Sequence, residues 1–592
     1  MASEDAIRRA AFATERSALR TARLRDARRM FCRMRFNAVS FRFFAAMGDR
    51  IPAHFILCEM RQGLVGATAI MMTTFVASRF LGWLRLSVIS ARFGASSDLD
   101  AFLAANVVPE FLFNLVVAGA LTSAFSPVFA GYLAKEREQE AWHVASSVLN
   151  AMLLALVVIS GVLAVSAPLY VPYVAAGFRD RPELLALTID LTRIMLLSPI
   201  FMGLSSLITG ILNSYRQFLS GAVAPVVYNA VIILCVVFLE PFLHIYALAA
   251  GVVAGALTMW LVQIPELAFR RTRYSLALDL AHSGVREVAK LTGPRALAQG
   301  SAFLVVPGVN AALATGLAAG SLVALNWAFA LMLMPLGVFS MAISSAIFPS
   351  LAHFAALGQT LRLRAALAQA IRLILFLTLP AAVAMIVLRR PIVHLLFQYG
   401  RFDDAAREAT AAAFLFYAVG LAGHALVQIL TRAFYAAKDT RTPLVTTLVS
   451  IAANVALAFI LVGWVVGGEP LGIQGLALAN SVATLAEAAF LLALLQSRVR
   501  LPMSSIALAT LRQLTAALLM GIATFGYVHL TNFTLQLEVS KLGLALQLLS
   551  AFAVAGASYL VACWILRVGE MRTALGVFRG STSSAVLTEP PT

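Results

Sequence analysis

Two stretches of this sequence that lie 222 residues apart resemble one another. Residues 122–132 read TSAFSPVFAGY, and residues 344–354 read SSAIFPSLAHF. A second pair keeps the same offset, because residues 208–218 read ITGILNSYRQF and residues 430–440 read LTRAFYAAKDT. One such match is expected by chance in an apolar chain, but two at one offset indicate an internal repeat. The sequence therefore predicts two related halves.

The composition around these repeats is that of an integral membrane protein. Of the 592 residues, 61% are hydrophobic and 12% are charged, whereas soluble domains are about 45–50% apolar and about 25% charged. The apolar runs reach the roughly 20 residues that a spanning helix needs. Backbone groups in hydrocarbon must be satisfied within the chain, so we expect an all-α integral membrane fold of about fourteen transmembrane helices.

The predicted spans are apolar runs bounded by polar clusters. They cover residues 63–88, 101–131, 143–171, 186–212, 220–242, 244–268, 292–318, 320–350, 367–388, 408–435, 442–466, 472–496, 508–530 and 544–566. With the repeat, they predict a basic N-terminal tail (1–62), an N-lobe (63–268), a connector (269–291), a C-lobe (292–500), two extra C-terminal helices (501–570) and a C-terminal tail (571–592). Six spans per lobe is an even number, so the repeat is parallel.

Lysine and arginine in the loops predict the orientation. Eighteen of them fall on one side of the membrane and eight on the other, and the side with the excess is the cytoplasm. Both termini are therefore expected to be cytoplasmic. Residues 1–61 add thirteen arginines against six acids and no long apolar stretch, which is typical of a tail near anionic lipid and not of a cleavable signal peptide. The net charge of +17 is therefore explained without a nucleic-acid partner.

The sequence contains no pattern typical of an enzyme or of a metal centre. Its four cysteines, Cys32, Cys58, Cys235 and Cys563, lack the spacing of a zinc, haem or redox motif. No Walker motif, His–Glu metal motif or nucleophile constellation occurs. We therefore expect no catalytic residue, no metal and no cofactor, while coupling to an ion or to the membrane potential stays open. A two-lobed chain of this kind is predicted to be a transporter with its substrate between the lobes.

Charges inside the predicted spans are rare, and such residues usually face a cavity. Arg79 and Arg85 lie six residues apart in the first span, about 120° apart on a helix, so both can line one wide cavity. Snorkelling to the headgroups is the structural alternative for Arg85. A cavity with arginines suits an anionic substrate, because guanidinium pairs bidentately with phosphate and stays charged.

The second span carries a polar face. Asn106, Glu110 and Asn114 are spaced i, i+4 and i+8, on one side of a helix. Glu110 is expected to face the cavity or to pair with one of the two arginines, and a hydrogen-bonded ladder between helices is the structural alternative. The predicted substrate-binding residues are Arg79, Arg85, Asp100, Asn106, Glu110, Asn114, Arg295 and Asn326.

Residues 78–111, SRFLGWLRLSVISARFGASSDLDAFLAANVVPEF, resemble the first two helices of the MurJ/MviN flippase family through S-R-x-L-G-x-x-R and D-A-F. ILNSYRQF, LLFQYGRF and AFYAAKDTRTP resemble later landmarks, so the likeness covers about residues 63–500. It implies a flippase for a lipid-linked (undecaprenyl diphosphate) peptidoglycan precursor, working by alternating access in the bacterial inner membrane. Functional positions are implied at Arg79, Arg85 and Asp100. We expect a monomer surrounded by membrane lipids.

The chain departs from this family at the cavity. Family members carry an arginine pair in the second helix where this chain has Phe-Asn at 113–114, and an Asp-Arg pair in the eighth where it has Phe-Ala at 329–330. Glu110 adds a negative charge. Either the diphosphate is held differently, with Arg295 compensating, or the carried lipid differs. A flippase for another lipid-linked oligosaccharide, a cation-coupled multidrug exporter of the same superfamily and a non-transporting scaffold are the alternatives.

Overall fold

The computed structural model of this chain is built almost wholly from α-helices. It describes residues 53–116, 120–215, 217–268, 274–466, 469–531 and 540–571. The chain divides into two units, Met1–Ala69 and Ile70–Thr592. The described part of the first unit is the beginning of α3 (Ala53–Phe93), so most of the predicted basic tail lies outside the described residues, as does the predicted C-terminal tail from residue 572 onward.

The helices follow one another along the second unit with short connections. The first half contains α4 (Ser97–Val116), α5 (Ala120–Ala134), α6 (Glu138–Val174), the 3-10 turn η1 (Ala176–Phe178), α7 (Pro182–Met195), α8 (Ser198–Ser214), α9 (Leu219–Leu243), α10 (Tyr246–Leu261) and α11 (Ile264–Ala268). The second half contains α12 (Ser283–Ala314), α13 (Ser321–Pro335), the π-turn η2 (Leu336–Ser340), α14 (Met341–Ala356), α15 (Thr360–Phe397), α16 (Asp404–Ala436), α17 (Arg441–Val462), the antiparallel strands β1 (Val465–Val466) and β2 (Glu469–Pro470), and α18 (Ile473–Val499). The chain continues with α19 (Met503–Leu530) and α20 (Lys541–Ile565).

The helices agree with the predicted spans. Among the described residues, eleven helices are long and apolar enough to cross a membrane. The three predicted spans outside that set, 63–88, 101–131 and 292–318, coincide with α3, with α4 and α5, and with α12. The protein is therefore a multi-pass membrane protein with helices in all fourteen predicted spans.

Two of the predicted spans are not continuous α-helices in the part of the chain that the structure describes. The fourth is divided into α7 and α8 because Pro199, at the start of α8, favours a new helix N-terminus. The eighth passes through η2 directly after Pro335, and π-turns of this kind interrupt helices locally. The second contains α4 and α5, and residues 117–119 between them lie outside the described residues. The matched sequences at 122–132 and 344–354 fall on α5 and α14, so the repeat forms the same helical piece twice.

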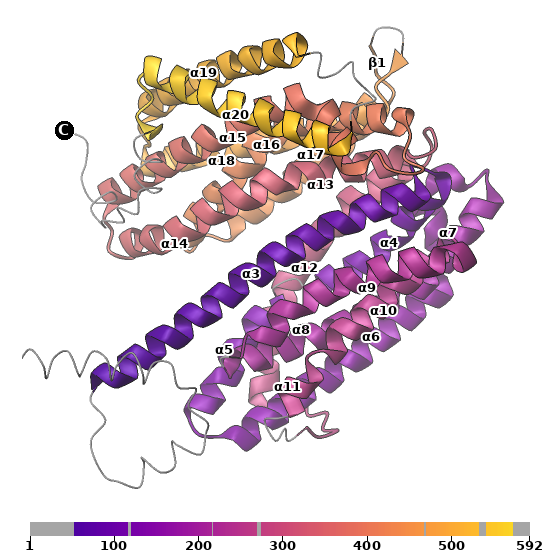
Figure 1. Cartoon of the computed structure of the whole chain (residues 1–592). Coiled ribbons are helices and arrows are strands. Elements are labelled where there is room, and N and C mark those ends of the chain that lie inside the picture. The colour runs from indigo at the N-terminus through magenta and orange to yellow at the C-terminus, as the bar shows by residue number, and fades with distance from the viewer. Residues whose placement is uncertain are drawn as a thin grey trace, which may run out of the picture. The chain divides into compact units, whose positions relative to one another are not determined.

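The two halves also repeat the same packing. α4 packs on α7 and α9 on α10 in the first half, while α13 packs on α16 and α17 on α18 in the second. The last two helices lie outside this repeat, because α19 and α20 pack on α15 and on each other (Figure 1). This arrangement confirms the predicted fold class of two six-span lobes with two additional C-terminal helices.

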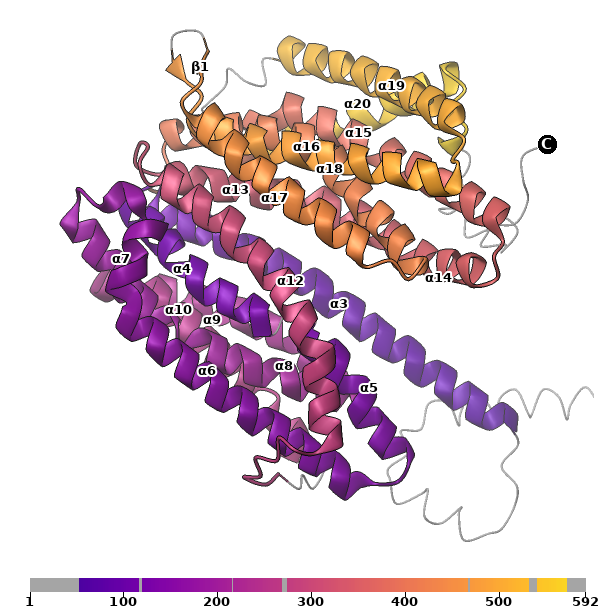
Figure 2. The ribbon, with the colours of Figure 1, turned by 180° about the vertical axis from the view of Figure 1, so that it is seen from behind.

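The first helix of each half lies between the halves. Residues 70–93 of α3 run between the two bundles in both views (Figures 1 and 2). Although α12 begins the second half of the sequence, it packs along α4 and α5 and also contacts α17. These two helices would therefore contact a substrate that is bound between the lobes.

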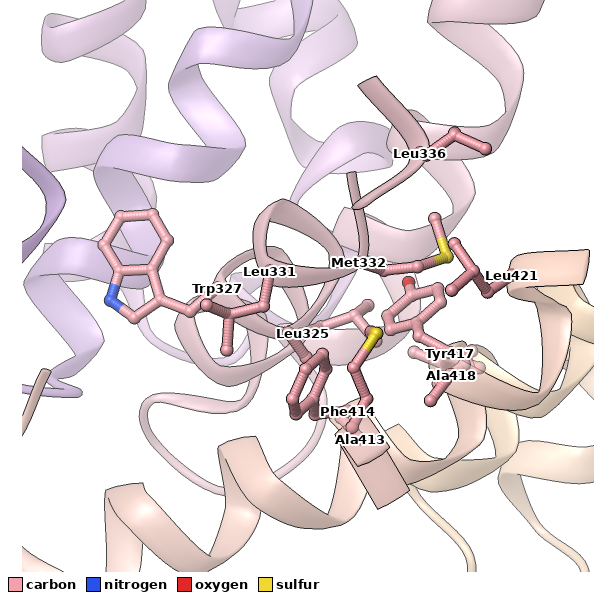
Figure 3. Packing of buried hydrophobic residues seen from close by; sticks show 14 of the residues in the cluster. Leu325, Trp327, Leu331, Met332, Leu336, Ala413, Phe414, Tyr417, Ala418 and Leu421 are labelled. Carbon is pink, nitrogen blue, oxygen red and sulfur yellow. The ribbon is translucent and has the colours of Figure 1, made fainter. Parts of the chain in front are cut away.

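The packing of α13 on α16 forms part of the largest buried cluster that the structure describes. Leu331 and Met332 of α13 lie against Phe414 and Tyr417 of α16 (Figure 3). Lipid tails are as apolar as these side chains, so close packing and hydrogen bonds hold membrane helices together more than burial does. This contact therefore holds α13 in place, and α13 also contributes a residue to the candidate functional site.

Residues 274–282 of the predicted connector lie along α6, and its residues 283–291 form the start of α12. Asn150 of α6 donates a hydrogen bond to the carbonyl of Ser275 (3.0 Å). The Nε2 atom of His143 lies 3.2 Å from the carboxylate of Asp279, and this hydrogen bond holds the pKa of Asp279 below its usual value. The connector is thereby bound to the first half.

Candidate functional site

A polar cavity of about 280 Å³ lies among α3, α4, α8, α9 and α10 of the first half and is bordered by α13 of the second. Its polar lining residues are Arg85, Asn106, Glu110, Ser198, Tyr228 and Trp327. Three predicted substrate-binding residues, Arg85, Asn106 and Glu110, therefore meet in one place. We call this space the polar cavity.

The polar residues of α4 hydrogen-bond within their own helix. Asn106 Nδ2 donates to Glu110 Oε2 (3.2 Å), and Asn114 Nδ2 donates to the main-chain oxygen of Glu110 (2.9 Å). The stripe is therefore not a ladder between helices. The Glu110 side chain is exposed to the polar cavity, and its Oε1 atom has no hydrogen-bond partner in the described part of the chain.

Arg85 supplies the positive charge of the polar cavity. Its Nε atom is buried without a hydrogen-bond partner among the described residues. Its guanidinium carbon lies 5.9 Å from the ring centre of Tyr228, at the outer limit of about 6 Å for a cation–π contact. Across the described residues no salt bridge of 4.0 Å or less joins Arg85 or Arg79 to Glu110. Arg85 is therefore the cationic side chain that lines the polar cavity.

The other predicted residues lie elsewhere. Arg79 does not line the polar cavity, because its exposed guanidinium lies over the ring of Phe75 at 5.2 Å. Asn326 is exposed on α13 and donates to a carbonyl of its own helix (2.9 Å). Arg295 is on α12, and its side chain lies outside the described residues. For all three, contact with a substrate stays a prediction.

An apolar groove of about 910 Å³ lies on the other side of α3, among α13, α15, α19 and α20. Trp83 of α3 borders it, and Leu549, Phe552 and Leu560 of α20 line it while remaining exposed at the surface. Trp83 and Arg85 are two residues apart, so they point about 200° apart around the helix. α3 therefore separates a polar cavity from an apolar groove.

Hydrogen bonds and ion pairs join the described residues of 70–268 to those of 315–571 at one end of the bundle, the closed end. It comprises residues 87–100, 177, 240, 315–327 and 396–401. Asp100, which is buried, accepts from the N–H groups of Gly320 (2.7 Å) and Val323 (2.8 Å) at the start of α13. Trp327 Nε1 donates to Ser90 Oγ (2.8 Å). Asp100 therefore lies at the lobe contact and not in the polar cavity, and it satisfies N–H groups that a helix start leaves free.

Glycines let the main chains of the two halves touch at this end. Gly94, Gly320 and Gly400 all have positive φ, and a Cβ at each would overlap a main-chain oxygen of the other half. At Gly400 that oxygen is the carbonyl of Ala91, which also accepts a hydrogen bond from the N–H of Arg401 (2.9 Å). A residue with a side chain at position 400 would therefore separate the halves.

Gly400→Ala is expected to open the closed end, whereas Gly358→Ala is not. Both glycines have positive φ (+54° and +65°), but a Cβ at Gly358 meets nothing within 4 Å. Both variants place a non-glycine residue in the left-handed region, which costs about 1–2 kcal/mol. Only Gly400→Ala also makes a Cβ overlap the carbonyl oxygen of Ala91. Spin labels at Ala186 and Ala405, exposed residues of the two halves, should report a longer distance in Gly400→Ala alone. Equal distance distributions would contradict this account.

A buried carboxylate adds an ionic contact across the halves. Glu240 of α9, 6% exposed, lies 3.4 Å from Arg92 Nη1 of α3 and 3.6 Å from Arg401 Nη1 of the second half. The sequence analysis did not identify Glu240, although a carboxylate inside the predicted span 220–242 was the signal that could have found it. Tyr228 was also missed, because nothing local distinguishes it from other aromatic residues of apolar helices.

The fold and the site define a class of protein: a two-lobed membrane transporter with a polar site beside the contact of its lobes. The sequence profile described as "Lipid II flippase MurJ" matches residues 89–544. That match covers more than half of the chain, and the chain belongs to the lipid II flippase MurJ family.

Curated relatives and solved structures agree with this assignment. The lipid II flippase MurJ of Burkholderia cenocepacia is 32% identical over 372 residues, which are 62% of this chain and 72% of that protein. The probable lipid II flippase MurJ of Bdellovibrio bacteriovorus is 30% identical over 448 residues, 74% of this chain and 83% of that protein. A structure of lipid II flippase MurJ in the inward closed conformation is similar with a TM-score of 0.69 and 23% identity, covering 84% of this chain and 98% of that one. An inward-facing multidrug resistance MATE transporter of the MOP superfamily has a TM-score of 0.60 and 17% identity over 74% of this chain and 99% of that one, and both structural likenesses show the fold alone.

Proposed function

We propose that this chain is a flippase that moves lipid II, the undecaprenyl diphosphate-linked precursor of peptidoglycan, across the bacterial inner membrane by alternating access. The observation that carries the proposal is the position of α3. Arg85 lies in the polar cavity, and Trp83 borders the apolar groove on the other face of the same helix. An amphipathic lipid has a charged head and an apolar tail, and α3 offers each of them a matching surface.

The charged head has one well-defined contact in this proposal. The guanidinium of Arg85 can bind two oxygens of a diphosphate at once, and its Nε atom has no competing partner among the described residues. Arg79, Arg295 and Asn326 are proposed to contact the headgroup at other stages of its passage. The tail is proposed to lie along the groove beside α20, where Leu549 and Phe552 face outward.

The proposed orientation follows from the loop charges. With both termini in the cytoplasm, the closed end faces the periplasm and the loops at residues 134–138 and 356–360 face the cytoplasm. The headgroup then enters from the cytoplasmic side. Release requires the hydrogen bonds of Asp100 and Trp327 to break and the lobes to rotate about the bound lipid. The protein is proposed to act as a monomer.

A flippase for a different lipid-linked oligosaccharide is the second candidate. The observation that favours it is Glu110, a carboxylate exposed in the same cavity as Arg85. A diphosphate alone would be repelled by that carboxylate, so a headgroup of different charge would fit it better.

Complementation tests the proposal directly. The full chain is expected to restore growth to a bacterium depleted of its own lipid II flippase when its abundance in the membrane matches that of the depleted protein. The same purified chain in vesicles should move lipid II from one leaflet to the other. A chain that is abundant in the membrane but restores no growth, and that moves only other lipid-linked oligosaccharides in vesicles, would replace the first candidate with the second.

A further inference from the structure

The last helix of the chain begins with a lysine whose charge serves another helix. Lys541 is the first residue of α20, where the positive end of the helix dipole disfavours a cation. Its Nζ atom donates to the main-chain oxygens of His394 (3.3 Å) and Gln398 (2.8 Å) at the end of α15. It also lies 4.7 Å from the ring centre of Tyr399, within the range of a cation–π contact. Lys541 therefore stabilises the end of α15, where main-chain oxygens lack partners within the helix.

The segment that this lysine binds also reaches the first half. We call residues 394–401, the end of α15 and the turn that follows it, the α15–α16 corner. The main-chain oxygen of Leu396 accepts a hydrogen bond from Ser87 Oγ of α3 (2.6 Å). Five residues further on, the N–H of Arg401 donates to the carbonyl of Ala91 (2.9 Å). The α15–α16 corner therefore connects α20 on one side with the closed end on the other.

We propose that Lys541 is a positioning residue for the closed end and that α20 acts on the equilibrium of the lobes through it. The α15–α16 corner bonds to Ala91 through its main chain, since Gly400 has no side chain and the N–H of Arg401 is the donor. A hydrogen bond weakens steeply when its donor and acceptor move out of line, so this contact requires the corner to be held in one conformation. The proposal rests on the alternating access of the proposed function, and it gives the two helices outside the repeat a role in closing the lobes.

A second cation binds the α15–α16 corner from α16. Arg407 Nη1 donates to Gln398 Oε1 (3.1 Å), and Gln398 Nε2 donates to Asp404 Oδ1 (2.9 Å). These bonds hold a side chain of the corner, whereas Lys541 holds its main-chain oxygens. Because the contact with Ala91 is also made by the main chain, Lys541 has the more direct influence on it.

The opposite end of α20 provides a matched control. Glu570, which follows α20, pairs with Arg372 of α15, with 3.2 Å between Oε1 and Nε. This ion pair joins the same two helices as Lys541 does, but it lies about 33 Å along α15 from His394. Breaking it should loosen the attachment of α20 without changing the α15–α16 corner.

The experiment uses the full chain in vesicles with spin labels at Ala186 and Ala405. Lys541→Met and Lys541→Gln remove the charge with little change in length, and each should raise the ratio of long to short label distances about tenfold, the lower limit for hydrogen bonds to a charged group. Neither distance should itself change, because the substitutions alter only the populations of two arrangements. Lys541→Arg keeps the charge and the donors and should retain a ratio close to that of the wild-type protein, as should Glu570→Gln. The series is repeated in Asp100→Asn protein, whose weaker contact at the start of α13 populates both arrangements measurably.

Each other outcome has a distinct meaning. A wild-type ratio in both neutral variants and in both backgrounds overturns the proposal and shows that Arg407 is sufficient to hold the α15–α16 corner. An equal rise in Glu570→Gln assigns the effect to general loosening of α20, and a shift of the short distance itself indicates a local movement of α16, so either result also overturns it. Wild-type protein that shows both label distances but moves no lipid-linked oligosaccharide overturns the proposed function and leaves the role of Lys541 standing.

Discussion

Replacing Asp100 with alanine is expected to open the closed end and to slow lipid translocation by roughly a hundredfold or more. The carboxylate accepts two hydrogen bonds at the start of α13, and hydrogen bonds to charged groups contribute about 1.5–3 kcal/mol each. Losing both removes about 3–6 kcal/mol and shifts the balance between the two lobe arrangements by about two to four powers of ten. Transport in vesicles and the distance between labels at Ala186 and Ala405 measure the two effects.

Two variants control this experiment. Asp98 is exposed two residues earlier on α4, and Asp98→Ala should leave both measurements unchanged. Asp100→Asn keeps one acceptor oxygen and should lie between the wild-type protein and Asp100→Ala. An Asp100→Ala protein with the wild-type label distance and wild-type transport would show that the hydrogen bonds to Gly320 and Val323 do not control the closed end.

Arg85→Ala is expected to reduce lipid II transport by a factor of ten to a hundred without lowering the amount of folded protein in the membrane. The change removes both the charge and the bidentate hydrogen bonds to phosphate, worth about 1.5–3 kcal/mol in binding. Arg85→Lys keeps the charge without the fork and should retain partial transport. Arg179→Ala is the control, because Arg179 lies outside the cavity and bonds to the carbonyl of Pro172. Abundance is measured alongside transport for every variant.

A double substitution distinguishes a substrate-binding role of Arg85 from a purely structural one. If Arg85 only balances the charge of Glu110 in the folded protein, Arg85→Ala should lower the abundance of the protein and Glu110→Gln should restore it. Because no salt bridge joins the two residues, we expect no such rescue. Normal transport by Arg85→Ala at normal abundance would remove the anionic contact from the mechanism altogether.

The number of helices was predictable because the length of an apolar run depends only on local sequence. The interruptions within the spans were not predictable, because a proline does not always interrupt a helix. Pro168 and Pro172 lie inside the continuous helix α6, whereas Pro199 begins α8. Neighbouring helices and side chains can satisfy the backbone groups that a proline releases, so the outcome depends on packing that the sequence does not display.

The candidate site was also predictable only in part. The face formed by Asn106 and Glu110 follows from helical periodicity and was predictable. Arg79 and Arg85 are about 120° apart, an angle that allows either a shared cavity or two separate environments. The structure shows two separate environments, because Arg85 lines the polar cavity and Arg79 lies over the ring of Phe75. The closed end depends on main-chain contacts between residues some 300 positions apart, such as Ala91 and Arg401, and no local pattern predicts such a contact.

The apolar groove beside α20 has a thermodynamic consequence for substrate choice. Moving a methylene group from water into an apolar site is worth about 0.8 kcal/mol, but a lipid tail that enters the groove from the bilayer leaves an equally apolar medium. Partitioning between bilayer and groove is therefore close to neutral for each isoprene unit. The tail confines its headgroup to the plane of the membrane and raises its local concentration there. With the tail in the groove as proposed, discrimination among lipids of different chain length is expected to be weak, and selection is expected to depend on the headgroup.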